Sequence, residues 1–139
     1  MNKTSQICCQ AEKFVIEKEG PGWRIVMDLS RGSFPYLLGG QSWSVEITHD
    51  EWNSLFKIVN DLKTQHKDLS KQLLPDESIV LEMERLPWWA CLEGDASSWS
   101  LQVVLKSDDK TLRSFEAFWP KQVSENVFLA MRTIWDSNQ

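Results

Sequence analysis

The chain has 139 residues, of which 42% are hydrophobic and 25% are charged, a balance typical of globular proteins that excludes a disordered or fibrous chain. At this length roughly two thirds of the unfolded chain's surface can be buried on folding, so we expect one compact core. Fifteen basic and twenty acidic residues give a net charge of -5, which argues against a protein whose main task is binding polyphosphate. The unusual count is eight tryptophans, which either fill the core or mark a contact surface.

The cysteines, the histidines and the N-terminal region indicate where the protein works. Its three cysteines are odd in number and include no C-x-x-C pair, which is typical of a reduced compartment rather than of a disulfide-bonded secreted domain. With only two histidines, His49 and His66, we expect neither a metal site nor a cofactor. No segment has the length and hydropathy of a signal peptide or a membrane span. We therefore expect a cytoplasmic protein without membrane contact, whose residues 1–12 form a flexible tail.

Residues 13–75 carry the pattern of four strands followed by one helix. Apolar residues alternate with polar ones in four short runs before residue 48, and turns rich in glycine, proline and serine separate the runs, which predicts antiparallel strands joined by tight turns. Thr48 followed by Glu51 is the pattern of a capping box and predicts a helix start. Apolar residues then recur at helical spacing until Pro75, where we expect the helix to end.

The long predicted helix has apolar residues at alternating spacings of four and three from Leu55 onward, if His66 is counted among them. This is the heptad spacing of a coiled coil, and about 25 residues would span roughly 37 Å, more than one small sheet requires. The stripe either packs on the sheets of its own chain or reaches a second subunit with its distal half. In the second interpretation Leu62, His66, Leu69 and Leu73 lie in a homodimer interface, where His66 sets register or responds to pH.

Residues 76–136 repeat the same plan. Four more alternating runs are separated by turn residues, Pro120 suits the first position of a helix, and an amphipathic pattern follows it to the C-terminal end. The predicted fold class is therefore α+β. A single domain over residues 13–139 is built from two repeats, 13–75 and 76–136, each of four antiparallel strands followed by a helix.

Strand parity divides the tryptophans between interior and surface. Five share the parity of other apolar strand residues and are expected in the core: Trp23, Trp43, Trp89, Trp99 and Trp119. Trp52 and Trp135 lie on the apolar faces of the two predicted helices. Only Trp88 has the opposite parity, so we predict that it is exposed or at an interface.

No arrangement of residues predicts catalysis. Nucleophilic catalysis needs a serine or cysteine beside a base, and one of the two histidines lies at a helix start while the other lies in the apolar stripe. Glu82 and Glu84 share the outward face of one strand, about 7 Å apart, where they suit either acid–base chemistry or a solvated surface. Phosphate-loop, dinucleotide, metalloprotease and nucleophile-elbow motifs are absent from the sequence. We expect a protein that is not an enzyme. A small carboxylate-based enzyme that uses Glu82 and Glu84 ranks third, behind the two binding functions given below.

The outward faces of the predicted strands are acidic. Six acidic residues oppose three basic ones there: Glu17, Asp28, Glu46, Glu82, Glu84 and Glu116 against Lys13, Arg24 and Lys106. Counterion release does not favour single-stranded nucleic acid on such a surface, although curved antiparallel sheets are common platforms for it. Arginines near strand ends and turns can still line a groove: Arg24, Arg31, Arg85 and Arg113.

Several short segments before residue 53 resemble a family of small uncharacterised cyanobacterial proteins, the domain of unknown function 1818. They are Gly22-Trp23-Arg24, Asp28-Leu29-Ser30-Arg31-Gly32, Pro35-Tyr36-Leu37, Gly39-Gly40, Trp43, Glu46-Ile47-Thr48 and Glu51-Trp52. The resemblance extends over residues 14–136. It implies a fold similar to the Whirly proteins and the transcriptional positive cofactor 4, whose single-stranded DNA binding domains consist of four strands and a helix. It implies no activity, and a similar fold is weak evidence for function.

The family pattern draws attention to Arg31 and to nearby glycines. Gly32, Gly39 and Gly40 are expected to supply positive backbone angles in tight turns. Arg31 either braces its own turn by pairing with Asp28 or contacts an anionic ligand.

We predict a non-enzymatic binding or protein-interaction module that forms a homodimer. The candidates for ligand or interface contacts are Arg24, Arg31, Trp88 and Arg113. A transcriptional regulator that binds single-stranded nucleic acid is the alternative, suggested by the fold resemblance and disfavoured by the acidic strand faces.

Overall fold

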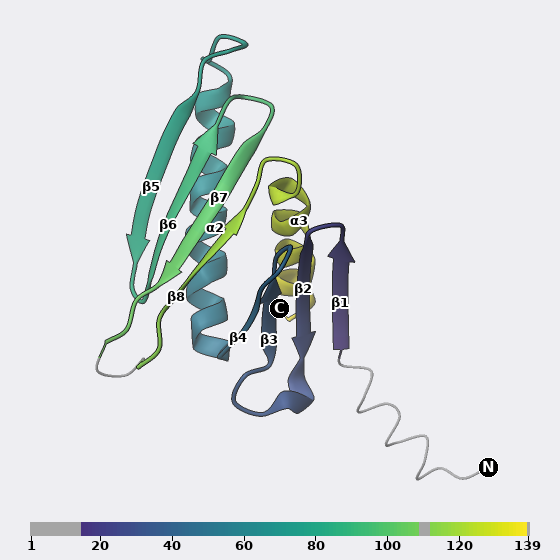
Figure 1. Ribbon diagram of the computed structural model, residues 1–139. Coiled ribbons are helices and arrows are strands. Elements are labelled where there is room, and N and C mark those ends of the chain that lie inside the picture. Colours follow the sequence, from purple (N-terminus) through teal and green to yellow (C-terminus); the bar gives the residue numbers. More distant parts are fainter. Residues whose placement is uncertain (1–14, 109–111, 139) are drawn as a thin grey trace, which may run out of the picture.

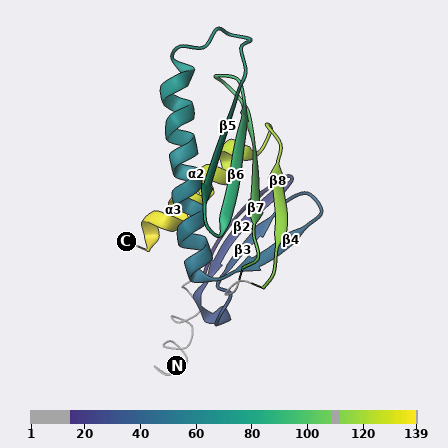
Figure 2. The same ribbon diagram turned by 90° about the vertical axis from the view of Figure 1, so that its left-hand side faces the viewer.

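The computed structural model describes residues 15–108 and 112–138, which form two four-stranded antiparallel sheets and two α-helices (Figures 1 and 2). Sheet A has the order β1-β2-β3-β4, with strands Val15–Gly20, Trp23–Asp28, Tyr36–Gly39 and Ser44–Ile47. Sheet B has the order β5-β6-β7-β8, with strands Ile79–Arg85, Trp88–Gly94, Trp99–Leu105 and Phe115–Trp119. Helix α2 (His49–Ser70) follows sheet A, and helix α3 (Ser124–Ser137) follows sheet B. The predicted α+β class and the repeated plan are confirmed, whereas the predicted tail, residues 1–12, lies outside the described residues.

Glycines explain two of the turns in sheet A. Gly22, between β1 and β2, has a φ of 83°, a backbone angle that favours glycine. Gly32 has a φ of 67°, as expected, but Gly39 and Gly40 do not have positive φ angles, so the prediction is wrong for them. Gly40 is required for a different reason, because a Cβ there would lie 2.2 Å from Nε1 of Trp43.

Helix α2 begins where the sequence predicts and ends earlier. The Thr48 hydroxyl accepts a hydrogen bond from Glu51 N (3.1 Å), and the Glu51 carboxylate accepts one from Thr48 N (2.9 Å), which completes the capping box. The helix ends at Ser70, before Pro75. No residue of α2 beyond His66 is buried, and helices in proteins depend mainly on packing of an apolar face. The segment before Pro75 therefore lacks the contacts that would extend the helix.

Each helix packs on the sheet of the other repeat. Helix α2 lies against β5 and β6 of sheet B, whereas α3 lies against β2 of sheet A and also contacts β7 of its own repeat (Figures 1 and 2). The helices also contact one another, where Trp135 stacks on Phe56 with 4.6 Å between ring centroids. Side chains from both sheets and both helices form one hydrophobic core, so each repeat supplies the cover for the other.

Tryptophans also join the two repeats. Trp119 on β8 donates from Nε1 to the backbone O of Gly39 on β3 (2.9 Å), and its ring centroid lies 5.3 Å from that of Trp43. Within the first repeat, Trp52 on α2 stacks on Tyr36 of β3 with centroids 4.6 Å apart, so the first turns of α2 also contact their own sheet. Core packing is confirmed for six of the tryptophans predicted to be inside: Trp23, Trp43, Trp52, Trp99, Trp119 and Trp135.

The predictions for the adjacent residues Trp88 and Trp89 are wrong. Trp88 is fully buried and donates from Nε1 to the backbone O of Glu51 (2.9 Å), whereas Trp89 is half-buried on the opposite face of β6. The reason is register. Trp88 pairs with Leu105, a core residue of β7, and directly paired residues share a face of the sheet. Because β6 carries apolar residues at both parities, its own alternation does not determine which set faces the core.

Candidate functional site

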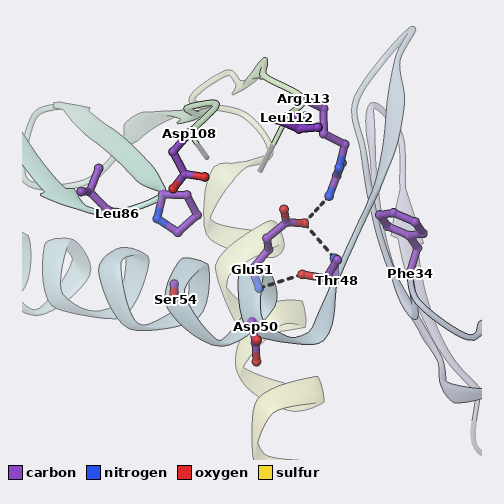
Figure 3. A pocket seen from close by; sticks show the side chains of 10 residues that line it. Phe34, Thr48, Asp50, Glu51, Ser54, Leu86, Asp108, Leu112 and Arg113 are labelled. Carbon is purple, nitrogen blue, oxygen red and sulfur yellow. Dashed lines mark hydrogen bonds and ion pairs between the residues drawn. The ribbon is translucent and has the colours of Figure 1, made fainter. Parts of the chain in front are cut away.

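A hollow of about 590 Å³, here called the α2 groove, lies at the N-terminal end of α2, where both repeats meet (Figure 3). The segment before β3, the first turns of α2, the turn between β5 and β6, and the connection between β7 and β8 all contribute. Its apolar lining residues are Phe34, Leu86, Pro87 and Leu112. Its polar lining residues are Thr48, Asp50, Glu51, Ser54, Asp108 and Arg113.

The side chain of Arg113 holds the walls of the α2 groove together. Its guanidinium contacts the Glu51 carboxylate and donates from Nη1 to the backbone O of Glu46 (2.9 Å). The Cζ atom lies 4.9 Å from the ring centroid of Phe34, within the range of a cation–π interaction. Figure 3 shows the Arg113 side chain reaching from the β7–β8 connection toward Glu51, with Phe34 beside it. The structure thus places this predicted contact residue in the groove wall, with its charge already paired.

Glu51 is a site residue that the sequence analysis placed in a helix cap and in a segment of the family resemblance, but not in a site. Its side chain is 7% exposed, and a carboxylate buried to that extent needs polar partners. Thr48 N and the Arg113 guanidinium supply them, while the Glu51 backbone O accepts the hydrogen bond from Trp88. Glu51 therefore couples the start of α2 to sheet B and to the β7–β8 connection. The capping box and the Glu51-Trp52 segment were the sequence signals for it.

Arg31 and Arg113 are brought together in a second hollow of about 630 Å³ that runs along β4. Phe34 and Arg113 line both hollows. Arg31 contacts the carboxylate of Glu46 on β4, whose backbone O binds Arg113. Two of the four predicted contact residues thus lie side by side, and each is paired with a glutamate.

The predicted pairing of Arg31 with Asp28 is replaced by a local cap. The Asp28 carboxylate accepts hydrogen bonds from Ser30 Oγ (2.6 Å) and Ser30 N (3.0 Å), which caps the short 3-10 helix Leu29–Arg31. These bonds, the hydroxyl one first, lower the pKa of Asp28, with a smaller contribution from the charge of Arg31. Arg31 therefore braces the turn across to β4 rather than within it.

The other two predicted contact residues lie outside both hollows. Arg24 is on the outer face of sheet A, where it pairs with Glu17 (3.2 Å) and Glu19 (3.4 Å). Trp88 is inside the core and touches the α2 groove only through its hydrogen bond to the backbone of Glu51. As a surface contact residue, Trp88 is excluded by its burial.

The four predicted interface residues of α2 divide into two pairs. Leu62 and His66 are buried within the chain, and His66 Nε2 lies 2.8 Å from the backbone O of Asp95. Leu69 is 39% exposed and Leu73 is half-buried. The intramolecular interpretation therefore holds for Leu62 and His66, which face sheet B rather than a second subunit. Only the distal pair is accessible from outside.

The remaining candidates for chemistry lie apart from the α2 groove. Glu82 and Glu84 are on the exposed outer face of sheet B, where Glu84 contacts Lys106. Within residues 15–108 and 112–138, no cluster of three or more His, Cys, Asp or Glu side chains has the geometry to hold a metal ion. Neither α2 nor α3 is long and apolar enough to cross a membrane, as far as the described chain is concerned.

Sequence and structural similarity extend over both repeats. The family model described as Domain of unknown function (DUF1818) matches residues 18–134. A crystal structure of a protein with unknown function from the DUF155 family, from Prochlorococcus sp. NATL2A, is 45% identical to this chain with a TM-score of 0.81, over 87% of this chain and 98% of that one. No curated protein matches this chain. The resemblance expected from the motifs is confirmed, whereas the similarity to Whirly proteins and positive cofactor 4 stays a prediction.

Proposed function

This chain belongs to the family Domain of unknown function (DUF1818), and we propose that it is a non-enzymatic protein-interaction module. In this proposal the α2 groove takes up an apolar side chain from a segment of a partner protein. The observation that carries it is the exposure of apolar side chains around the groove. Leu112 is 85% exposed, Leu86 68% and Phe34 36%. Exposed apolar side chains gathered around a hollow are characteristic of binding sites.

The polar lining favours a partner segment with a basic residue beside its apolar one. Asp50 and Asp108 are exposed and line the groove. Arg113, the only basic residue in the described lining, is paired with Glu51. The described lining therefore holds three acidic residues and one basic residue, and carboxylates at a rim attract Lys or Arg side chains.

The same lining supports binding rather than catalysis. Among the lining residues that the structure describes there is no histidine and no cysteine, the side chains most often used as bases and thiol nucleophiles. Glu51, the buried carboxylate of the groove, is already held by Thr48 N and Arg113. The groove thus has an apolar rim, and the charge of its buried carboxylate is neutralised by Arg113. This arrangement suits the binding of an apolar side chain.

Selection of a random peptide library on the intact chain tests this proposal. Selected peptides should carry an apolar residue next to Lys or Arg. Calorimetry should show that Leu112→Ser and Leu86→Ser each weaken binding by about tenfold or more, because each removes apolar surface from the rim without changing its charge. Leu74→Ser is the matched control, since Leu74 is 66% exposed but follows the opposite end of α2. Equal affinity for all three variants would overturn the proposal.

The homodimer stays a prediction, and its support now comes from the distal end of α2. Leu69 and Leu74 are exposed there, and Leu73 is half-buried. These leucines are the part of the apolar stripe that the sheets leave uncovered.

Binding of single-stranded nucleic acid also stays a prediction. Its new support is the presence of Trp89 and Phe118 on the outer face of sheet B, where bases stack in other binding sheets. Exposed glutamates on the same face oppose it: Glu82, Glu84, Glu93 and Glu116. A filter-binding assay with labelled single-stranded DNA across salt concentrations tests it, because a real complex must weaken as salt rises.

A further inference from the structure

The face of sheet B that points away from α2 is open. Helix α2 covers one side of the sheet, and no helix of the described chain lies on the other (Figures 1 and 2). Strand register sets two rows of side chains across it. One row is Glu82, Cys91, Gln102 and Phe118, and the next is Glu84, Trp89, Val104 and Glu116. With Val80 and Glu93, these residues define the open face of sheet B.

Apolar side chains run across the open face from one edge strand to the other. Val80 on β5 is 55% exposed and Phe118 on β8 is 52% exposed. Trp89, Cys91 and Val104 lie between them and are half-buried. The sheet buries its core residues on the other side, and this second apolar strip lies outside the hydrophobic core. Such a strip, bordered by polar residues, is characteristic of an interaction surface.

The border of the strip is acidic. Four exposed glutamates lie on the open face: Glu82, Glu84, Glu93 and Glu116. The basic side chain recorded beside them is Lys106, which is paired with Glu84. Three of the four glutamates therefore have no basic partner among the described ion pairs.

We propose that the open face of sheet B docks a basic amphipathic segment of another protein. The apolar side of such a segment covers Trp89, Val104 and Phe118, and its Lys or Arg side chains reach the surrounding glutamates. This combination of an apolar strip and complementary charge is the usual means by which amphipathic helices are recognised. No residue of the open face lines the α2 groove, so the inference is independent of the proposed function.

Charge distinguishes this occupant from two others. A second copy seated on the same face would place glutamates against glutamates, which opposes association. Nucleic acid would meet the same repulsion through its phosphates. A basic partner is the one for which the apolar contact and the charge act together.

A synthetic amphipathic peptide made only of leucine and lysine serves as the probe. Labelled peptide and the full chain are mixed, and binding is followed by fluorescence anisotropy at several salt concentrations. We expect the binding to weaken as salt rises. Phe118→Ser combined with Val80→Ser should reduce the affinity by about tenfold or more, whereas Leu129→Ser should leave it unchanged. Leu129 is the control because it is 50% exposed on α3, away from sheet B. Because the α2 groove would accept the same kind of peptide, all these measurements are made on a chain that also carries Leu112→Ser and Leu86→Ser, which removes binding at the groove.

Two matched peptides and one matched variant separate charge from surface recognition. Replacing leucine by serine in the peptide should abolish binding, and replacing lysine by glutamate should do the same. The double variant Glu82→Gln with Glu93→Gln should weaken binding and reduce its salt dependence. Equal binding of the serine–lysine peptide, or equal binding by Phe118→Ser with Val80→Ser, would overturn the proposal. The proposal would also be overturned if light scattering showed that the chain alone forms a dimer and that Phe118→Ser with Val80→Ser dissociates this dimer.

Cys91 provides a direct footprint of the occupied surface. With Cys8→Ser and Cys9→Ser it is the only thiol of the chain, and it lies half-buried in the middle of the strip. Burial, followed by the charges of Glu82 and Glu93, raises the pKa of this thiol. Alkylation of Cys91 is therefore measured at alkaline pH, where the thiolate forms. The bound leucine–lysine peptide covers the thiol, so the alkylation rate should be lower with the peptide than without it. An unchanged alkylation rate at saturating peptide would contradict docking on this face.

Discussion

The carboxylate of Glu51, in the first turn of α2, contacts the guanidinium of Arg113, 62 residues later in the chain. The contact closes the α2 groove on one side, and it connects a helix cap formed by the first repeat to a loop of the second. Because the Glu51 side chain is 7% exposed and that of Arg113 is 34% exposed, the pair lies between the surface and the core. Its partners include the backbone of Glu46 and the ring of Phe34.

Arg113→Gln is expected to lower the free energy of unfolding by about 2 kcal/mol, because it leaves the Glu51 carboxylate buried with fewer partners. Urea denaturation followed by circular dichroism measures the change. Arg24→Gln is the control, since Arg24 forms its ion pairs on the exposed face of sheet A and should cost less than about 0.5 kcal/mol. Equal losses in the two variants would show that the Glu51–Arg113 contact does not stabilise the fold.

Trp88→Phe and Trp89→Phe form a matched pair on adjacent positions of β6. The first removes the hydrogen bond from Nε1 to the backbone O of Glu51 and leaves a cavity in the core, so we expect a loss of about 2–3 kcal/mol. The second changes a half-buried ring on the open face of sheet B and should cost under about 1 kcal/mol. Unfolding in urea measures both, and the reverse order would contradict the register of β6.

Leu62→Glu and Leu69→Glu distinguish the packed part of α2 from its accessible part. Leu62 is fully buried, so a carboxylate there should cost about 4 kcal/mol or more and unfold much of the population. Leu69 is 39% exposed, and its replacement should change stability by less than about 1 kcal/mol. If the distal leucines join two subunits, light scattering should show a dimer for the parent chain and a monomer for Leu69→Glu. A monomeric parent would refute the homodimer.

We expect the contribution of Asp95 to the free energy of unfolding to depend on pH in the acid range. Its carboxylate accepts hydrogen bonds from Ser98 N and Ser97 N, each 2.9 Å, and these bonds lower the pKa of Asp95. A carboxyl whose pKa is lower in the folded chain contributes stability above its ordinary pKa and loses that contribution as the pH falls through the folded value. The stability difference between the parent and Asp95→Ala should therefore be constant near neutral pH and shrink below about pH 4.

Asp95→Asn is the control for that experiment. Its amide oxygen can accept the same backbone hydrogen bonds but does not titrate in this range, so it should keep part of the turn's stability without the acid dependence. Urea denaturation at several pH values measures all three proteins. A parent–alanine difference that grows toward acid pH would contradict the assignment.

Local patterns predicted the helices and strands well, but they predicted the wrong buried face for one strand, because that face depends on pairing with other strands. The capping box of Thr48 and Glu51 is confirmed because both partners lie within one helical turn. The predicted parity of β6 was wrong because apolar residues occupy both of its faces, and its pairing with Leu101, Val103 and Leu105 of β7 shows that Trp88 faces inward. A two-residue turn at Leu86 and Pro87 does carry parity from β5, because it pairs Arg85 with Trp88 and puts Trp88 on the face of Leu81 and Met83.

The amino-acid sequence by itself determined the α+β class, the repeated order of four strands and a helix, the start of α2 and the family, because these depend on short-range alternation, capping and motif residues. Only the tertiary structure decided that each helix packs on the sheet of the other repeat, that Leu62 and His66 face the core, and that Arg31 and Arg113 meet beside Glu46. These outcomes depend on which apolar surfaces lie close enough to exclude water together. Which surfaces come close together depends on the whole folded chain, so no periodic pattern in the sequence of a single segment predicts it.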